Sequence, residues 1–486
     1  DCILLTHAHI DHSGLIPLMY VNGFRGQVYS TSATAQLCEI MLRDSAHIQM
    51  FEAEWRNRKA ARSGGKLKEF VPLYDMDAAV NVCKQFVGCE YDRVYDIAEG
   101  IKIRFTDVGH LLGSASIEVW ATEKTENGDV TEKIVFSGDI GNINKPIIKD
   151  PKHVRDADYV VMESTYGNRS HGGTPNYVED LTDIFKRTFE RGGNVVIPSF
   201  AVGRTQELLY IIRKIKEDNL VGRDFDVYMD SPLAIEATNI FIKNVESCFD
   251  DDAVELVRKG INPLSFPGLK YATTGDESKQ INFDPNPKVI ISSSGMCEAG
   301  RIRHHLKHNL WRPECTIVFV GYQAVGTTGR IIVDGAEEIK LFGEPIQIKA
   351  EIVQLKGSSG HADKDGLLCW INAFDTKPKK VFVVHGEDSV CDEFTECLKE
   401  EYGYDAMAPY TGGSYDLIAD RVISEGVKER KTRRTTSTQR GKTVFDRLVA
   451  AGKRLMTVIT HNEGGTNKDL AKFTDQINAL CDKWDR

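Results

Sequence analysis

Four side chains of types that bind metal ions lie within six residues near the start of the chain. They are His7, His9, Asp11 and His12, in the pattern H-x-H-x-D-H directly after the apolar run at residues 2–5. Alternate residues at the end of a strand point the same way, so His7 and His9 can share one metal ion. Asp11 and His12 lie on the turn beyond and can reach a second ion. Imidazoles at this density rarely serve packing, so the pattern predicts a centre for two metal ions that can activate water.

The elements that must position these side chains alternate between strand and helix. Short apolar runs bounded by Gly, Ser or Asp predict strands buried on both faces. These runs lie at residues 134–136, 159–162, 194–197, 289–291, 316–320 and 381–384. Residues 181–189 and 208–215 have helical period, whereas residues 101–105 and 117–119 alternate as half-buried antiparallel strands do. We therefore expect an α/β fold with layered sheets, one of them mixed.

Bulk composition narrows the class of protein. At 486 residues the chain exceeds what one hydrophobic core usually supports, so we expect two or three domains. Hydrophobic residues make up 41% and charged residues 27%, as in a folded protein. A net charge of −10 argues against a surface coated with positive charge for nucleic acid, but it permits a local basic groove.

The cysteines and the termini bear on the cellular setting. Eleven cysteines are scattered from Cys2 to Cys481 without a C-x-x-C pair, which disfavours thiolate-bound zinc and favours a reducing, cytoplasmic setting. No stretch approaches the roughly 20 apolar residues that cross a bilayer, so we expect no membrane span. The chain begins at Asp1 and enters an apolar run at once, and we interpret it as lacking its natural start.

The H-x-H-x-D-H pattern resembles the metal-binding element of the metallo-β-lactamase superfamily. Two later residues match the partners that this resemblance implies. His110, after an alternating strand, matches the third histidine of a first zinc site, and Asp139, after a buried strand, matches the aspartate that bridges both ions. Taken alone, His110 would more often be a loop histidine and Asp139 a helix cap. Beside the first pattern, the resemblance favours the metal-binding role for both.

Three further segments resemble motifs A, B and C of the β-CASP group, the branch that includes RNase J and the mRNA 3′-end cleavage factors. Glu163 lies in Met-Glu-Ser-Thr-Tyr-Gly, His361 lies in the glycine-rich residues 357–363, and His385 lies in Val-His-Gly-Glu. The motif-C histidine implies the completion of a second zinc site. DNA nucleases of the Artemis type usually carry a different residue there. The resemblance, which runs from residue 1 to about 420, therefore implies RNA as the substrate.

The resemblance implies a metallo-β-lactamase αβ/βα sandwich interrupted by an inserted α/β β-CASP cap domain. The expected parts are residues 1–174 (first part of the lactamase domain, without its N-terminal strands), 175–345 (cap domain), 346–425 (return segment) and 426–486 (basic linker and helical C-terminal extension). The linker is indicated by the basic composition of Lys428–Lys442, and the terminal helix by apolar spacing at Leu470, Phe473, Ile477 and Leu480.

The resemblance also implies a role for each side chain. Two zinc ions would be held by His7, His9 and His110, and by Asp11, His12 and His385, with Asp139 between them. The catalytic residues would be Asp11, Glu163 and His361. Among these, His361 would protonate the departing 3′ oxygen, and Glu163 would orient its imidazole.

Segments at residues 198–204, 292–296 and 299–306 resemble bacterial and archaeal members and imply contacts with the substrate. Candidate contacts are Arg204, Ser294 and Arg301, although an ion pair is as good an explanation for both arginines. Single-stranded RNA would enter between the two domains, because a duplex is too wide for such a slot.

Other functions remain compatible with the residues. A small-molecule thioester hydrolase would share the metal ligands but would not need the cap domain or Glu163. A non-catalytic RNA-processing subunit usually loses metal ligands, and a DNA nuclease is disfavoured by His385. Internal cleavage, 5′-exonucleolytic cleavage and a homodimer all remain open from the sequence.

Overall fold

The structure is a computed structural model that describes most of the chain. The described residues are 1–62, 69–126, 128–170, 172, 176–355, 359–428, 452, 455–456, 458–460, 462 and 467–484. They divide into two compact units, Asp1–Glu425 and Gly426–Arg486. The first unit contains every candidate site residue.

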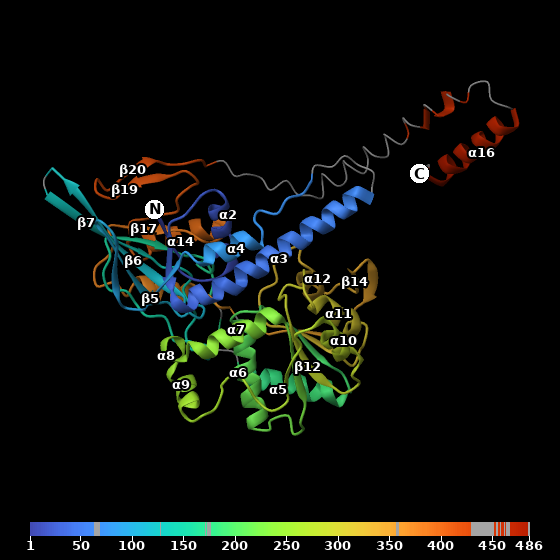
Figure 1. The fold of residues 1–486 in the computed structure, drawn as a ribbon, viewed down its shortest axis with the longest axis horizontal. Coiled ribbons are helices and arrows are strands. Elements are labelled where there is room, and N and C mark those ends of the chain that lie inside the picture. The colour runs from blue at the N-terminus through green and yellow to red at the C-terminus, as the bar shows by residue number, and fades with distance from the viewer. Residues whose placement is uncertain are drawn as a thin grey trace. The chain divides into compact units, whose positions relative to one another are not determined.

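A seven-stranded mixed sheet forms one half of a sandwich (Figure 1). In spatial order its strands are β18 (Ala406–Met407), β17 (Lys380–Val383), β8 (Tyr159–Met162), β7 (Gly128–Phe136), β6 (Ala115–Thr125), β5 (Ile101–Asp107) and β4 (Val94–Ala98). Strands β4 to β7 pair antiparallel, whereas β7, β8, β17 and β18 pair parallel. The mixed sheet expected from the alternating and the continuous apolar runs is therefore confirmed.

A three-stranded parallel sheet of β1 (Cys2–Leu4), β2 (Gln27–Thr31) and β3 (Phe86–Cys89) forms the other half. Tyr29 packs against Ile103, Phe105 and Ile117 of the larger sheet. The next residue back, Val28, belongs to the core on the opposite face. That face is covered by α3 (Ser32–Arg62) and α4 (Met76–Cys83); α1 (Ile10–Ser13) and α2 (Ile16–Val21) follow β1. Because successive strand residues point to opposite faces, β2 joins two cores.

The outer face of the seven-stranded sheet is covered by α13 (Lys364–Ile371) and α14 (Asp388–Glu400), with Trp370 and Phe394 packed on Val160 and Val381. The layers are therefore helix, sheet, sheet and helix, which is the expected αβ/βα sandwich. The hairpin of β19 (Ser414–Asp416) and β20 (Arg421–Ser424) comes last in the sequence of this unit.

Residues 176–355, here called the inserted layer, contain a six-stranded parallel sheet. Its spatial order is β11 (Leu269–Tyr271), β10 (Asp226–Asp230), β12 (Lys288–Ser292), β9 (Val195–Pro198), β13 (Thr316–Phe319) and β16 (Glu351–Gln354). Val195 and Ile197 enter one core and Val196 the other, as expected for a strand buried on both faces. Strands β8 and β17 are neighbours in the sandwich although the inserted layer lies between them in sequence.

Helices cover both faces of this sheet. One face carries α5 (Tyr177–Glu190), α6 (Arg204–Glu217) and α7 (Pro232–Lys243), with α8 (Val245–Cys248) and α9 (Asp251–Arg258) following; the other carries α10 (Gly275–Phe283), α11 (Ile302–Asn309) and α12 (Thr328–Val333). The hairpin of β14 (Glu338–Leu341) and β15 (Glu344–Gln347) lies beside α12. Strand β16 pairs with β13, so the six-stranded sheet extends beyond the boundary at residue 345 expected from the sequence.

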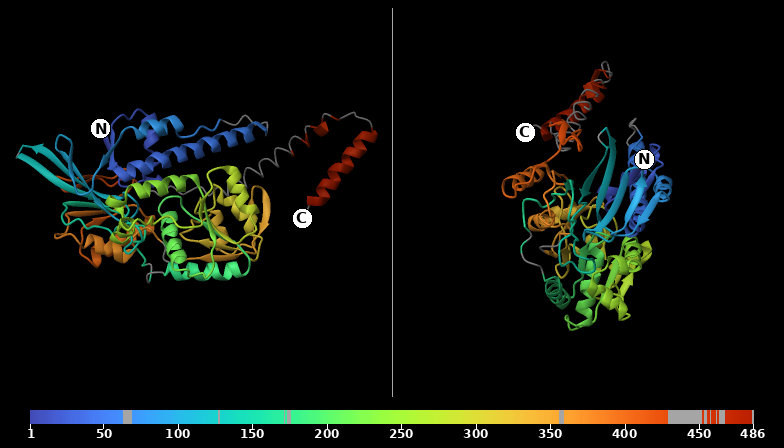
Figure 2. Two further views of the ribbon diagram at one scale, coloured as in Figure 1. Left: turned by 60° about the horizontal axis from the view of Figure 1, so that its bottom comes forward. Right: turned by 90° about the vertical axis from the view of Figure 1, so that its left-hand side faces the viewer.

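The inserted layer packs against the long helix of the sandwich. Leu37 of α3 and Phe241 of α7 share one buried cluster, and Asn244 donates a hydrogen bond to Gln36 Oε1 at 3.0 Å. In the left view of Figure 2 the yellow-green α7 lies beside the long blue α3. The inserted layer and the sandwich therefore share a continuous core.

The second unit contains α16 (Asn467–Trp484), which confirms a helix at the apolar spacing of Leu470, Phe473, Ile477 and Leu480. The basic stretch 429–442 lies outside the described residues. Among the described helices none has the length and apolar character needed to span a membrane.

Candidate metal centre

The H-x-H-x-D-H segment lies where β1 turns into α1. His9 has the extended backbone of a helix N-cap, and the Ser13 hydroxyl donates to the carbonyls of Ala8 and His9 at 2.9 and 3.1 Å. This tie fixes the turn, in which His7 and His9 lie between the end of β1 at Leu4 and the start of α1, while Asp11 and His12 lie in the helical turn. The segment follows a strand and enters a turn, as predicted, but the strand ends at Leu4, before both histidines.

Four donor atoms converge at the first candidate ligand set, which consists of His7, His9, His110 and Asp139. His9 Nδ1 lies 3.1 Å from both His7 Nε2 and His110 Nε2. Asp139 Oδ2 lies 3.3 Å from His7 Nε2 and 3.5 Å from His110 Nε2. A tetrahedral zinc with bonds of about 2.0–2.1 Å separates its donors by about 3.3 Å. The spacing of this set therefore fits one zinc ion.

The other oxygen of Asp139 faces the second set, which consists of Asp11, His12 and His385. Asp139 Oδ1 lies 3.3 Å from both His12 Nε2 and His385 Nε2. Asp11 Oδ2 lies 3.7 Å from His12 Nε2 and 4.0 Å from His385 Nε2. This set is wider and more exposed than the first. One carboxylate thus presents a separate oxygen to each group of histidines.

Two buried atoms, one on His12 and one on Asp139, indicate that the residues fit a metal ion. Within the described part of the chain, neither His12 Nε2 nor Asp139 Oδ1 has a partner in hydrogen-bond geometry, although they lie 3.3 Å apart. Buried polar atoms normally have partners, because an unsatisfied group is costly. A cation between these atoms would satisfy both, so we read the donor set as built for metal ions.

Strand ends and backbone constraints bring Asp139 and His385 to the same edge of the seven-stranded sheet. Asp139 follows β7 and His385 follows β17, both parallel to β8. Gly138 has a φ of +60°, and a Cβ there would lie 2.9 Å from the carbonyl oxygen of Ala115, so glycine is required. His385 itself has a φ of +52°, a conformation uncommon for this residue type and often found at functional sites.

Burial keeps the first histidines neutral. Desolvation lowers the pKa of His7, although hydrogen bonding to Asp139 opposes it, and desolvation lowers the pKa values of His9 and His110 well below their usual range. Burial alone would raise the pKa of Asp139, but the imidazoles of His12 and His7, each with a nitrogen 3.3 Å from one of its oxygens, hold it far below its usual range. Neutral imidazoles and an ionised carboxylate are the forms that bind zinc.

His361 and Glu163 form a pair beside this centre. His361 Nδ1 lies 3.2 Å from both carboxylate oxygens of Glu163, and His361 Nε2 lies 3.9 Å from Asp139 Oδ2. Glu163 also accepts the backbone N–H of Ile140 at 2.6 Å. Burial lowers the pKa of His361, but the Glu163 carboxylate outweighs burial, so this pKa is raised overall. Ala362 N donates to Ile140 O at 2.7 Å, which anchors the His361 loop beside Asp139.

The three predicted substrate contacts lie in the inserted layer, and both arginines have acidic partners. Arg204 pairs with Glu207 at 2.6 Å. Arg301 pairs with Asp230 at 2.7 Å and donates to two backbone carbonyls. Ser294 donates to the carbonyl of Ala299 at 3.2 Å. Both arginines therefore form the ion pairs considered as the alternative, and their contact with substrate stays a prediction.

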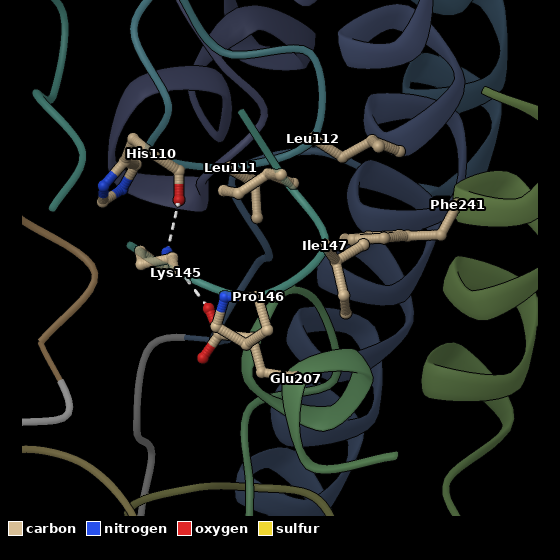
Figure 3. A pocket seen from close by; sticks show the side chains of 10 residues that line it. His110, Leu111, Leu112, Lys145, Pro146, Ile147, Glu207 and Phe241 are labelled. Carbon is tan, nitrogen blue, oxygen red and sulfur yellow. Dashed lines mark hydrogen bonds and ion pairs between the residues drawn. The ribbon is translucent and has the colours of Figure 1, made fainter. Parts of the chain in front are cut away.

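Sequence patterns gave no signal for Lys145 and Glu207, which lie against the His110 loop. They line a small pocket with Leu111, Ile147 and Phe241, drawn in Figure 3. The only available hint was the spacing of Arg204 and Glu207 by three residues on an apolar helix, which permits an ion pair but does not place it.

The helix–sheet–sheet–helix sandwich with two histidine-rich donor sets at one strand edge defines a metallo-hydrolase of the metallo-β-lactamase class. The Beta-Casp domain family matches residues 205–332, and the family described as "Zn-dependent metallo-hydrolase RNA specificity domain" matches residues 345–409.

Similar proteins identify the branch. Ribonuclease TTHA0252 of Thermus thermophilus is 34% identical over 388 residues, which cover 80% of this chain and 81% of that protein. The RNase J-like protein of Methanocaldococcus jannaschii is 31% identical, over 80% of this chain and 82% of that protein. Transcription termination factor FttA of Methanosarcina mazei is 32% identical over 84% of this chain, which spans 62% of that factor's length. The chain belongs to the β-CASP family of the metallo-β-lactamase superfamily.

Proposed function

We propose that the chain is a zinc-dependent ribonuclease that hydrolyses phosphodiester bonds of single-stranded RNA. The observation that carries this proposal is the gathering of six donor side chains in two sets around the carboxylate of Asp139, with the His361–Glu163 pair alongside. Similarity to proteins named as ribonucleases supports RNA as the substrate class.

The residues suit two zinc ions. His7, His9 and His110 would hold one, Asp11, His12 and His385 the other, and Asp139 would bridge them. Zinc ions bound there would supply an acidified water as nucleophile and offset the charge that grows on the phosphate. The outer ring nitrogens are held as metal ligands require: His110 Nδ1 lies 3.2 Å from the carbonyl of Gly360, and His7 Nδ1 lies 3.2 Å from the Thr6 hydroxyl.

His361 would act as the general acid. Glu163 lies against Nδ1 and fixes the imidazole plane, so Nε2 is directed towards Asp139 and the donor sets. A phosphate in contact with the centre would have its departing 3′ oxygen within reach of that nitrogen, which would give it a proton. Glu163 would keep the imidazole oriented, and its bond to the Ile140 backbone holds the carboxylate itself in place.

The proposal predicts a specific pattern of substrates. We expect the zinc-loaded chain to cut labelled single-stranded RNA, to leave a thioester intact, and to lose activity when zinc is removed by a chelator and regain it when zinc is restored. Labelled single-stranded DNA of the same sequence serves as the matched substrate, and we expect its cleavage to be much slower. Turnover of the thioester without RNA cleavage, or RNA cleavage that persists without metal, would refute the proposed function.

A further inference from the structure

One lysine connects the loop of His110 with the first turn of α6 in the inserted layer. Lys145 Nζ donates to the backbone carbonyl of His110 at 3.1 Å and lies 3.1 Å from Glu207 Oε1. Figure 3 shows the Lys145 side chain between that carbonyl and the Glu207 carboxylate. Arg204 pairs with the same carboxylate at 2.6 Å. The contact therefore runs from the inserted layer, through Lys145, to a candidate zinc ligand.

The side chains that form this connection are largely shielded from water, so water cannot easily replace their contacts. The side chains of Lys145, Glu207 and Arg204 are 12%, 8% and 14% exposed. Burial alone would raise the pKa of Glu207, but Arg204 and Lys145 outweigh burial and lower it, so the carboxylate stays ionised. Ion pairs are stronger where apolar groups exclude water, and a buried ion left without its partner is strongly unfavourable.

The same loop is fixed at other points by the sandwich alone. The backbone N–H of His110 donates to Ser114 Oγ at 3.0 Å, and its ring Nδ1 lies 3.2 Å from the carbonyl of Gly360. Gly109 has a φ of +65° and lacks room for a Cβ beside the carbonyl of Lys149. The carbonyl of His110 is held by Lys145, and Lys145 is in turn paired with Glu207. The orientation of His110 is thus completed from the inserted layer.

We infer that Lys145 is a positioning residue through which the inserted layer holds the His110 imidazole towards Asp139. Its role is to set the zinc affinity of the first ligand set and the rate of the chemical step, without contact with RNA. The inference rests on the proposed function in that His110 is taken to bind zinc. It assigns Glu207 to the support of a metal ligand.

The test compares Lys145→Met, Lys145→Arg and Glu207→Gln with the parent chain. Lys133→Met is the matched control, because Lys133 forms a buried pair with Glu118 at 2.7 Å within the seven-stranded sheet. Loss of a side chain that supports a metal ligand typically lowers metal affinity or activity by about 10–100-fold. We expect that loss in the affinity of one of the two zinc ions for Lys145→Met and Glu207→Gln. Lys145→Arg should stay within a few-fold of the parent, as should Lys133→Met.

Two readouts separate this role from its alternatives. On single-stranded RNA we expect kcat of the Lys145→Met chain to fall at saturating zinc while KM is unchanged. A raised KM with zinc affinity and kcat unchanged would overturn the inference, because it would place Lys145 on the substrate. A loss of zinc affinity in Lys133→Met equal to that in Lys145→Met would also overturn the inference. Zinc affinity is measured without RNA. A parent chain that is inactive on RNA would therefore refute the proposed function, but the comparison of zinc affinities among the variants would still decide the role of Lys145.

Discussion

Asp139→Asn is expected to weaken both zinc sites at once and to lower RNA cleavage by about 10³-fold or more. Each carboxylate oxygen of Asp139 faces a different histidine set at 3.3–3.5 Å. An asparagine keeps the shape but offers one oxygen and no charge, so one set loses its fourth donor and the bridge is lost. Metal ions typically supply several kcal/mol of transition-state stabilisation, and each ~1.4 kcal/mol is a tenfold change in rate.

The measurement is zinc per chain after dialysis, together with kcat on labelled RNA. Glu118→Gln is the matched control, since Glu118 is another buried acid held by cations, here Arg104 and Lys133, and lies outside the donor sets. The control should keep both zinc ions. An Asp139→Asn chain with two zinc ions and the parent rate would remove the bridging role of this carboxylate.

His361→Ala and Glu163→Gln are each expected to lower the cleavage rate by about 10²–10⁴-fold, the usual contribution of a general acid. The double variant should be little slower than the slower single variant, because groups that act as one unit are not additive. The reason is geometric: His361 Nδ1 has both Glu163 oxygens at 3.2 Å. His361→Ala should retain both zinc ions, since neither of the two ligand sets proposed for zinc includes its imidazole.

Single-turnover rates at saturating zinc and RNA make this comparison, with zinc content measured on the same samples. Glutamine at position 163 can still accept the Ile140 N–H, so the backbone next to Asp139 should keep its place. Full multiplication of the two single effects in the double variant would show that the residues act independently. A His361→Ala chain that binds zinc and cuts at the parent rate would remove the assigned acid.

The proximity of the four donor side chains near the start of the chain could be predicted from the sequence. They are His7, His9, Asp11 and His12, which lie within six residues between the end of β1 and α1, so their proximity follows from their spacing. The α/β class and the mixed sheet were also predictable, because continuous and alternating apolar runs differ in burial.

Convergence of the remaining site residues depended on tertiary pairing. Asp139, Glu163 and His385 follow β7, β8 and β17, which are parallel neighbours and so end at one edge. No local sequence pattern indicates that β8 and β17 pair with each other, because the whole inserted layer lies between them in sequence. Only the family resemblance brought these residues together at the level of sequence.

Long-range polar contacts explain what the sequence did not show. Strand β16 extends the six-stranded sheet past residue 345 because its register with β13 is set by neighbours distant in the chain. Arg301 reaches Asp230, and Lys145 reaches Glu207, through the packing of separate helices and loops. Charged side chains have no periodicity that would reveal such partners.

The central claim is that seven side chains hold two metal ions, with Asp139 shared between them. The most direct test is a crystal structure of the zinc-loaded chain with anomalous diffraction recorded on both sides of the zinc absorption edge. Two zinc peaks are predicted, one among the nitrogen atoms of His7, His9 and His110 and one beside His12 and His385. A map without zinc at these atoms, from crystals of a chain that cuts RNA, would contradict the account.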